Sequence, residues 1–303
     1  MLNRRIIKLA IAILVLLPKM STAQASVKEQ LNIALSKPGK PFNLEAILEK
    51  GIIKIITYPG TDIQIETEAL AEKIEKAKPN QNQNQNQNTN TNTNVNIDVA
   101  KSKKDNNTAR SKYISVTENN NLVIIKPILQ SKILSIVIRL PQNNVGLNLV
   151  IEKDGDILVS GITGKIEATN NTGSISLINI SGSALASTIT GAIIATFKSI
   201  TEKSPMAFST LIGNLDITLP ASLKANVKLK TDNGEIFTDF DIIENAAKPA
   251  AKPYPVPNPK AKQAGEARFK LNNTDWVYGK INRGGLELML QNMQGNIYIR
   301  KLK

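Results

Sequence analysis

The sequence contains neither cysteine nor histidine among its 303 residues. Their absence excludes thiol nucleophiles, histidine-based catalytic triads, thiolate zinc sites and imidazole metal ligands. A disulfide framework and a lipid anchor on cysteine are excluded as well. Any chemistry would have to use carboxylates, hydroxyls, lysine, arginine or tyrosine.

Aromatic residues are scarce, at 4%, so a single large aromatic core is not expected. The apolar residues are mainly Ile, Leu, Val and Ala, a composition that suits thin β-layers. The formal net charge is +13. A surplus of this size favours weak contact with anionic polysaccharide, membrane surfaces or nucleic acid, although solubility and the protection of sheet edges explain it more simply.

Glycine recurs every nine residues from Gly155 to Gly191. Aligned on these glycines, the five units read GDILVSGIT, GKIEATNNT, GSISLINIS, GSALASTIT and GAIIATFKS. The second and fourth residues after each glycine are apolar, and residues two apart share one face of a strand. We therefore expect the second residue to face inward in four of the units, namely Ile157, Ile166, Ile175 and Ile193.

Each unit is typical of one short strand and one turn, with glycine in the turn because it adopts positive φ without steric cost. A nine-residue unit cannot bury its own apolar face, so neighbouring units must stack into one core. The unit endings carry a weaker signal, with isoleucine at Ile162, Ile180 and Ile189 but Asn171 and Lys198 in the other two units. The pattern leaves open whether one turn of the stack holds one unit or two, and whether the strands run parallel or as an antiparallel meander.

Nine-residue repeats also occur in the calcium-binding β-roll, whose units carry a second glycine and an aspartate ligand. Here the residue after the glycine is aspartate only at Asp156. Because these ligands are missing, the sequence predicts no metal site and no cofactor.

Residues 1–25 have the features of a secretory signal peptide: basic residues, the apolar run Ile6–Leu17 broken only by Lys8, and small residues around Ala23 and Ala25. The run of about twelve residues is too short for a membrane span. Cleavage would release a protein without a membrane span to the periplasm, the cell surface or the extracellular space. An uncleaved N-terminal anchor is the alternative.

The mature chain divides into strand-rich parts and two low-complexity parts. The glycine rule already appears at Gly51, so the repeat domain begins before the central ladder. The tract Asn80–Asn96 alternates Gln or Thr with Asn and cannot offset the entropy of ordering. Just before it, the sequence allows a short helix at Glu68–Lys78. The expected parts are N-terminal β-strands at 26–78, a disordered insertion at 79–112, a central β-solenoid at 113–245, a Pro/Lys-rich connector at 246–265, and strands that complete or cap the stack at 266–303.

Several segments together resemble the putative-adhesin, β-strand-repeat family of secreted bacterial proteins, a domain of unknown function. The resemblance is carried by the glycine ladder and by Pro41–Glu66, Ser209–Pro220, Leu229–Phe240, Lys280–Gly285 and Gly295–Arg300. It implies a right-handed β-helix-like solenoid, export, and an adhesive or envelope role. The family supplies no catalytic residues, and the two low-complexity insertions depart from its compact members.

Two pairs of residues are candidates for ligand contact. Asp239 and Asp241 lie two apart and share a face, so they suit acid–base work on a sugar or calcium binding. Turn formation and a solvated strand face account for these acidic residues more simply. Trp276 and Tyr278 also share a strand face and suit a sugar-stacking platform, although packing or a cap at the end of the stack is the simpler account.

The residues favour an all-β protein, a β-solenoid of short strands that each begin at a glycine. We expect an exported, non-enzymatic adhesin-like or structural module of the bacterial envelope, with a cell-surface glycan or an envelope protein as partner. A polysaccharide-processing enzyme that uses carboxylates, lysine or arginine is the rival, and an envelope-stress accessory protein is a third hypothesis. No phosphate loop is expected, because Arg283-Gly284-Gly285 leads into strand alternation and not into a helix. Nucleic acid is not expected as a partner, because nucleic-acid motifs are absent and the few aromatics are not interleaved with basic residues.

Overall fold

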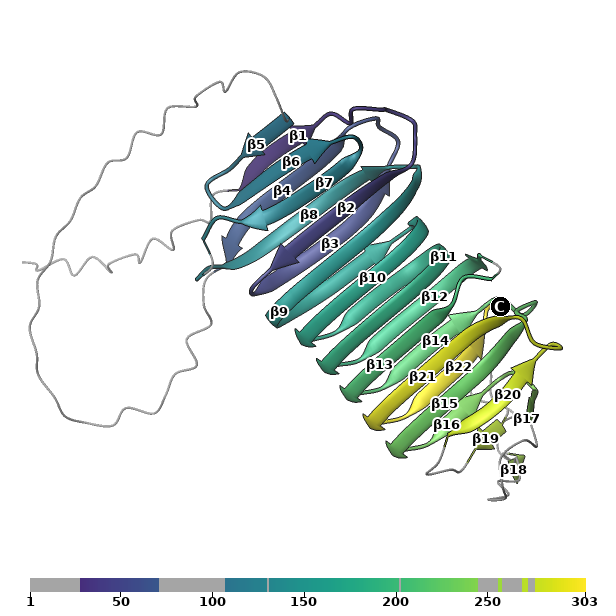
Figure 1. Cartoon of the computed structure of the whole chain (residues 1–303). Coiled ribbons are helices and arrows are strands. Elements are labelled where there is room, and N and C mark those ends of the chain that lie inside the picture. Colours follow the sequence, from purple (N-terminus) through teal and green to yellow (C-terminus); the bar gives the residue numbers. More distant parts are fainter. Residues whose placement is uncertain are drawn as a thin grey trace, which may run out of the picture.

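The computed structural model describes residues 28–70, 107–129, 131–201, 203–244, 256–257, 269–271 and 276–303. Every regular element in these ranges is a β-strand, and the strands form one large mixed sheet, as Figure 1 shows. The expected all-β class is confirmed for this part of the chain. The signal segment, the tract Asn80–Asn96 and most of the connector at 246–265 lie outside the described residues.

The strands have the following bounds. In the first half they are β1 Glu29–Ile33, β2 Phe42–Leu48, β3 Gly51–Tyr58, β4 Ile63–Leu70, β5 Asn107–Arg110, β6 Ile114–Asn119, β7 Leu122–Pro127, β8 Ile133–Pro141, β9 Asn144–Ser160, β10 Thr163–Thr172 and β11 Ile175–Thr190. In the second half they are β12 Ile193–Ile200, β13 Met206–Ile212, β14 Leu215–Leu219, β15 Ala225–Asn233, β16 Ile236–Thr238, β17 Ile242–Glu244, β18 Val256–Pro257, β19 Phe269–Leu271, β20 Val277–Ile281, β21 Leu286–Gln294 and β22 Ile297–Lys301.

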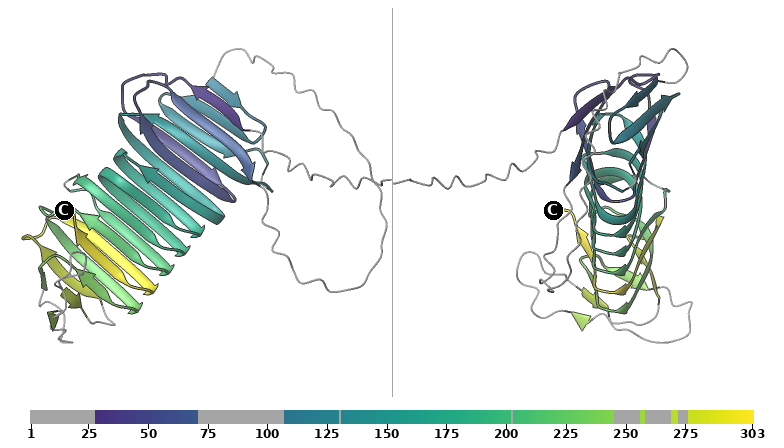
Figure 2. Two further views of the ribbon diagram at one scale, coloured as in Figure 1. Left: turned by 180° about the vertical axis from the view of Figure 1, so that it is seen from behind. Right: turned by 90° about the vertical axis from the view of Figure 1, so that its left-hand side faces the viewer.

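The central strands pair in parallel with partners eighteen residues away. Ile157 lies beside Ile175, and Ile175 lies beside Ile193. One nine-residue unit therefore lies on one side of the body and the next unit lies on the other side. The right-hand view of Figure 2 shows these two sides. We call two consecutive units, one on each side of the body, a level. This pairing answers the two open questions, because each level holds two units and these strands are not an antiparallel meander.

The core lies between the two sides and runs along the stack. Ile157, Ile166, Ile175 and Ile193 are fully buried, as the alternation predicts. Each such side chain contributes roughly 1.5–3 kcal/mol relative to full exposure, so the apolar residues of neighbouring levels hold the stack together.

The unit endings behave differently on the two sides. Ile162 and Ile180 are buried, whereas Ile189 is 51% exposed. Ile180 pairs with Phe197 across a register shift, and the buried Phe197 ring takes the inward place that Lys198 would otherwise occupy. The shared isoleucine at the unit endings was therefore only a partial guide to burial.

Glycines form a column at one corner of the stack. A Cβ atom on Gly173, whose φ is +127°, would lie 1.8 Å from the carbonyl oxygen of Gly155 in the neighbouring level. No side chain larger than hydrogen fits at that distance, so the corner requires glycine for both its conformation and its close approach. The residues of this column, in spatial order, are Gly51, Gly155, Gly173, Gly191, Gly213, Gly295 and Gly234.

The spatial order of the levels differs from the chain order at both ends. Strands β2 and β3 lie between the level of β7 and β8 and the long strand β9. Strands β21 and β22 likewise lie between the level of β13 and β14 and the level of β15 and β16. The last strands of the chain were expected to complete or cap the stack, and β21 and β22 are instead inserted within it. The alternation of apolar residues is the same in every level, so it does not by itself fix the order of the levels.

Antiparallel strands flank the two ends of the stack. At one end β1 pairs with β4, β4 with β8, and β5 with β6. At the other end β20 pairs antiparallel with both β15 and β17. Glu68, Ala69 and Leu70 continue strand β4 and do not begin a helix, because they pair with β8. Strand β5 lies in the range expected to be disordered, and its Ala109 packs against the core.

Candidate binding surface

Trp276 and Tyr278 lie on the outer surface near the end of the stack. Strand β20 pairs antiparallel with β15, with Tyr278 opposite Lys228 and Val277 opposite Leu229. Since side chains alternate along a strand, Val277 and Leu229 are buried while Tyr278 and Lys228 point outward. The two rings are half-buried, with centroids 6.5 Å apart and planes 42° apart. The two aromatic residues therefore share one face, as their spacing predicts, and neither belongs to the core.

Two lysines of β15 approach these rings. Lys228 Nζ lies 4.1 Å from the centroid of the Trp276 ring and 5.9 Å from that of Tyr278. Lys230 Nζ lies 5.9 Å from the Trp276 centroid and also pairs with Asp232 at 2.9 Å. A cation over an aromatic face is attracted by the ring quadrupole, so these contacts hold the lysines beside the rings. We call Trp276, Tyr278, Lys228 and Lys230 the lysine–aromatic surface.

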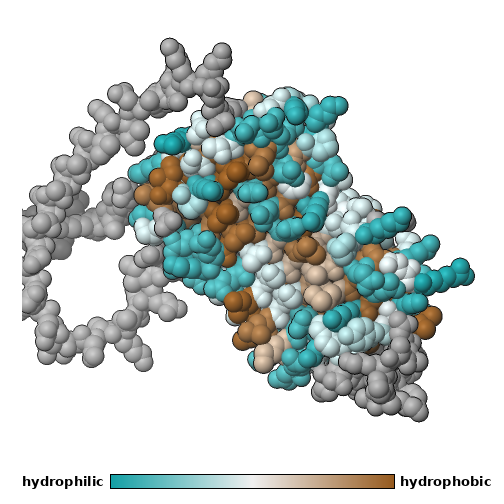
Figure 3. Space-filling model, in the orientation of Figure 1, coloured by the Kyte–Doolittle hydropathy of each residue, from teal (hydrophilic) through white to brown (hydrophobic). Residues whose placement is uncertain are grey.

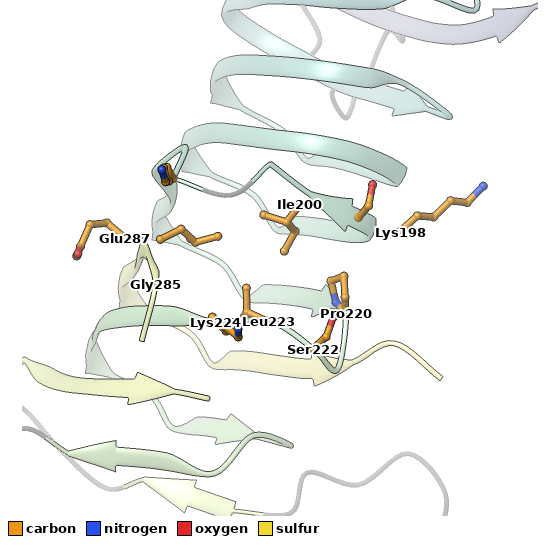
Figure 4. Close-up of a pocket in the computed structure, with 11 residues that line it drawn as sticks. Lys198, Ile200, Pro220, Ser222, Leu223, Lys224, Gly285 and Glu287 are labelled. Carbon is orange, nitrogen blue, oxygen red and sulfur yellow. The ribbon is translucent and has the colours of Figure 1, made fainter. Parts of the chain in front are cut away.

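A cavity of about 780 Å³ opens beside the start of β15. Figure 4 shows the residues that line it. It lies where the segment from Pro220 to Lys224 leads from β14 to β15 past the inserted level of β21 and β22. The buried side chains of Leu223 and Leu286 line its apolar part. The charged residues of its lining are all exposed and comprise Lys198, Lys203, Lys224 and Glu287. We call it the crossover cavity.

The crossover cavity and the lysine–aromatic surface are joined along β15. Lys224, Asn226, Lys228 and Lys230 are spaced two apart and face the same side. Asn226 Nδ2 donates hydrogen bonds to Glu287 Oε1 at 2.8 Å and to the carbonyl oxygen of Gly285 at 3.2 Å, which fixes the rim between them. The path from Lys224 to Lys230 covers six residues of extended chain, about 20 Å.

A smaller cavity of about 410 Å³ lies at the other crossover. It is lined by Thr57, Gln142, Asn143, Asn144, Gly161 and Thr163, none of which is charged. Here residues 142 and 143 lead from β8 to β9 past the inserted level of β2 and β3. Both cavities thus occur where the chain passes an inserted level. Only the C-terminal one combines cations with an apolar lining.

Asp239 and Asp241 lie in the segment that leads from β16, which pairs with β22, to β17, which pairs with β20. Asp239 Oδ2 accepts a hydrogen bond from the backbone N–H of Lys301 at 3.1 Å, so this carboxylate holds the last strand. Asp241 is exposed, and between the two lies Phe240, whose ring is buried. In the described part of the chain, no group of three or more acidic residues is arranged to hold a metal ion.

Arg300 fastens the same strand to its neighbour in the stack. Its Nε and Nη2 donate to Asp216 Oδ1 and Oδ2 at 2.7 and 3.1 Å, a two-point contact between β22 and β14. The hydrogen bond to Asp216 raises the pKa of Arg300, against the effect of burial. Arg300 and Asp239 therefore both hold β22 in place.

Sequence reasoning missed the lysines of the binding surface. The alternation of Lys224, Lys228 and Lys230 with buried Ala225, Val227 and Leu229 was visible in the sequence. What it did not reveal was the partner strand, because β15 and β20 are separated by a long stretch of chain that carries no pairing signal.

The chain was compared with protein families, curated proteins and solved structures. No family model and no curated protein matches the chain. A solved structure, described as a putative cell adhesion protein from Clostridium sporogenes, is similar at 11% identity with a TM-score of 0.39, covering 91% of this chain and 100% of that one. No function follows from a likeness at this level, and membership of the putative-adhesin family stays a prediction. None of the described segments is a helix with the length and apolar character to span a bilayer.

Proposed function

We propose that this chain is an exported, non-enzymatic β-solenoid that acts as an adhesin-like or structural interaction module of the bacterial envelope. The eighteen-residue pairing offset supports the solenoid, because each level repeats the same two-sided unit. The features of residues 1–25 support export. A cell-surface glycan or an envelope protein is the expected partner.

The observation that carries the interaction role is the contact of Lys228 with Trp276 on an outer strand face. Tryptophan and tyrosine provide a large and rigid contact area at a low cost in side-chain entropy. Here they stand on β20, which is hydrogen-bonded to β15 and β17. A site on paired strands is held in place before a partner arrives, so less ordering free energy is lost on binding.

The rival function is a polysaccharide-processing enzyme that uses Asp239 and Asp241. The hydrogen bond from Lys301 N to Asp239 gives this carboxylate a structural task, which favours the non-enzymatic role. A degradation assay on acidic and neutral polysaccharides compares the wild-type chain with Asp239→Asn and with Asp241→Asn. We expect no turnover by any of the three proteins. Turnover that Asp239→Asn abolishes, in a variant that still melts like the wild type, would establish the enzyme instead.

Export is tested separately in a bacterial host. The full chain is compared with a variant that lacks residues 1–25, and cytoplasmic, periplasmic, surface and medium fractions are probed. We expect the full chain outside the cytoplasm in a shortened form, and the truncated variant inside it. Retention of the full chain in the cytoplasm would refute the exported role.

A further inference from the structure

We infer that the lysine–aromatic surface and the crossover cavity together bind an acidic polysaccharide, which lies along β15. This inference rests on the proposed interaction role and adds the chemical class of the ligand. One end of the path offers two aromatic rings, and the other end offers an apolar cavity rimmed by lysines. A linear ligand that carries negative charge along its length matches both ends at once.

The first argument is charge. Lys198, Lys203, Lys224 and Lys228 form no ion pair with any carboxylate among the described residues. Other lysines of the stack do, such as Lys28 with Glu66 at 2.9 Å and Lys165 with Glu167 at 2.6 Å. These four lysines outnumber Glu287, the one carboxylate of the cavity lining. Cations without ion-pair partners attract a polyanion and speed its association.

The second argument is the position of Lys228 over the aromatic pair. A sugar ring has apolar C–H faces that pack against an aromatic ring, while its polar groups point sideways. Because Lys228 Nζ lies 4.1 Å from the Trp276 centroid, a ring packed on this pair brings its acidic group within reach of a cation. A uronic acid has both parts in a single unit.

The third argument is length. The path from Lys224 to Lys230 is straight, since both lie on one strand or at its edge, and it covers about 20 Å. A small anion would fill the cavity and leave the aromatic pair unused. A polymer of acidic sugars uses the cavity, the lysines and the rings together.

The experiment uses polygalacturonate, a polymer of uronic acid units, and the purified full chain. Trp276 is the single tryptophan of the sequence, so its fluorescence reports directly on this surface. The test variant is Lys224→Glu with Lys228→Glu. The matched control is Lys54→Glu with Lys126→Glu, which makes the same change of charge at two exposed lysines of β3 and β7, near the other end of the stack. Neutral galactan, a single-stranded oligonucleotide and vesicles of anionic lipid are the competing ligands.

We expect saturable polygalacturonate binding that shifts Trp276 fluorescence and weakens as salt is added. The test variant should bind about tenfold more weakly, and the control variant should bind like the wild type. Galactan should not bind. Equal weakening in both variants would show a general charge effect and overturn the site, as would tighter binding of the oligonucleotide or the vesicles through the same lysines.

A second pair of variants tests the rings. By calorimetry, Trp276→Phe should keep most of the affinity, and Trp276→Ala should weaken it about tenfold. If Trp276→Ala loses thermal stability, the lysine variants still decide the question, because Lys224 and Lys228 are not part of the core. These binding results do not depend on export, so a chain that is exported but binds no uronate polymer would overturn this inference alone.

Discussion

The hydroxyl group of Thr188 donates a hydrogen bond of 3.1 Å to the carbonyl oxygen of Gly173 in the neighbouring level. The same contact recurs along the glycine corner, from Asn170 to Gly155 at 2.7 Å, Thr210 to Gly191 at 3.0 Å, Asn292 to Gly213 at 3.0 Å and Thr231 to Gly295 at 2.9 Å. All five side chains are buried, and buried carbonyl groups need partners. A polar ladder thus accompanies the glycine column and ties each level to the next.

Thr188→Val tests this ladder. Valine has nearly the same shape as threonine, so the change removes the hydrogen bond to Gly173 and adds little strain. We expect the free energy of unfolding to fall by about 1–3 kcal/mol. The control is Thr169→Val at an exposed site of β10, where the change should stay within about 0.5 kcal/mol. Chemical denaturation measures both, and equal effects would show that the ladder contributes nothing.

Gly173→Ala tests the close approach at the corner. The new methyl group would lie 1.8 Å from Gly155 O, so neighbouring levels must move apart. We expect a loss of about 3 kcal/mol or more in stability, because strain and overpacking add. Gly39→Ala is the control, since its φ is also positive, at +75°, but no atom lies within 4 Å of the added carbon. That variant should lose only about 1–2 kcal/mol, as the conformational cost alone requires.

Ile175→Asp and Ile189→Asp compare two positions of strand β11. Ile175 is fully buried, and its replacement removes roughly 1.5–3 kcal/mol of apolar burial and adds a buried charge. We expect this variant not to fold. Ile189 is 51% exposed, and Ile189→Asp should melt close to the wild type. Similar behaviour of the two variants in thermal melts would mean that β11 is not oriented as described.

Glu118 makes stability depend on pH. Burial opposes its charge, but hydrogen bonds from Ser36 Oγ at 2.7 Å, Ser36 N at 3.0 Å and Asn121 N at 2.9 Å favour the carboxylate and hold its pKa below the ordinary value. This contribution is fully present above the unfolded-state pKa of about 4.3 and is lost as pH falls through the lower folded pKa. The difference in unfolding free energy between the wild type and Glu118→Gln should therefore be largest at about pH 6 and shrink as pH falls below about 4.3. A constant difference would exclude this role.

Deletion of Leu286–Lys303 tests the inserted level. In a stack that followed chain order, this deletion would remove only the final level. Here β21 is hydrogen-bonded to both β13 and β15, so its loss separates β15 and β16 from the rest. We expect amides of β15 and β16 to lose hydrogen-exchange protection, while deletion of Lys303 alone leaves protection unchanged. Full protection of β15 after the large deletion would contradict the observed order.

Much of the local structure could be predicted from the sequence. Alternation identified Ile157, Ile166, Ile175 and Ile193 as inward residues because a strand repeats every two residues. It also placed Trp276 and Tyr278 on one face. The unit endings misled, since Ile189 resembles Ile162 and Ile180 in the alignment but belongs to the other side of the body. A period of nine does not say which unit stacks on which.

The binding surface could be predicted only in part. Asp239 and Asp241 were predicted as candidates for ligand contact because paired carboxylates suit sugar chemistry. In the structure, the Asp239 carboxylate accepts a hydrogen bond from the backbone N–H of Lys301. Lys228 was not marked, because its contact with Trp276 depends on the pairing of β15 with β20. The crossover cavity was also invisible, since it arises from a level inserted between two others.

The sequence by itself determined the strands, their inward faces and the glycine corners, because these depend on residues a few positions apart. Tertiary structure decided which levels are neighbours, and hence where Lys224, Lys228 and Trp276 meet. The physical reason is that every level offers nearly the same apolar face and the same backbone edge. The local sequence pattern is therefore compatible with several orders of the levels, and only the packing of the whole chain selects one of them.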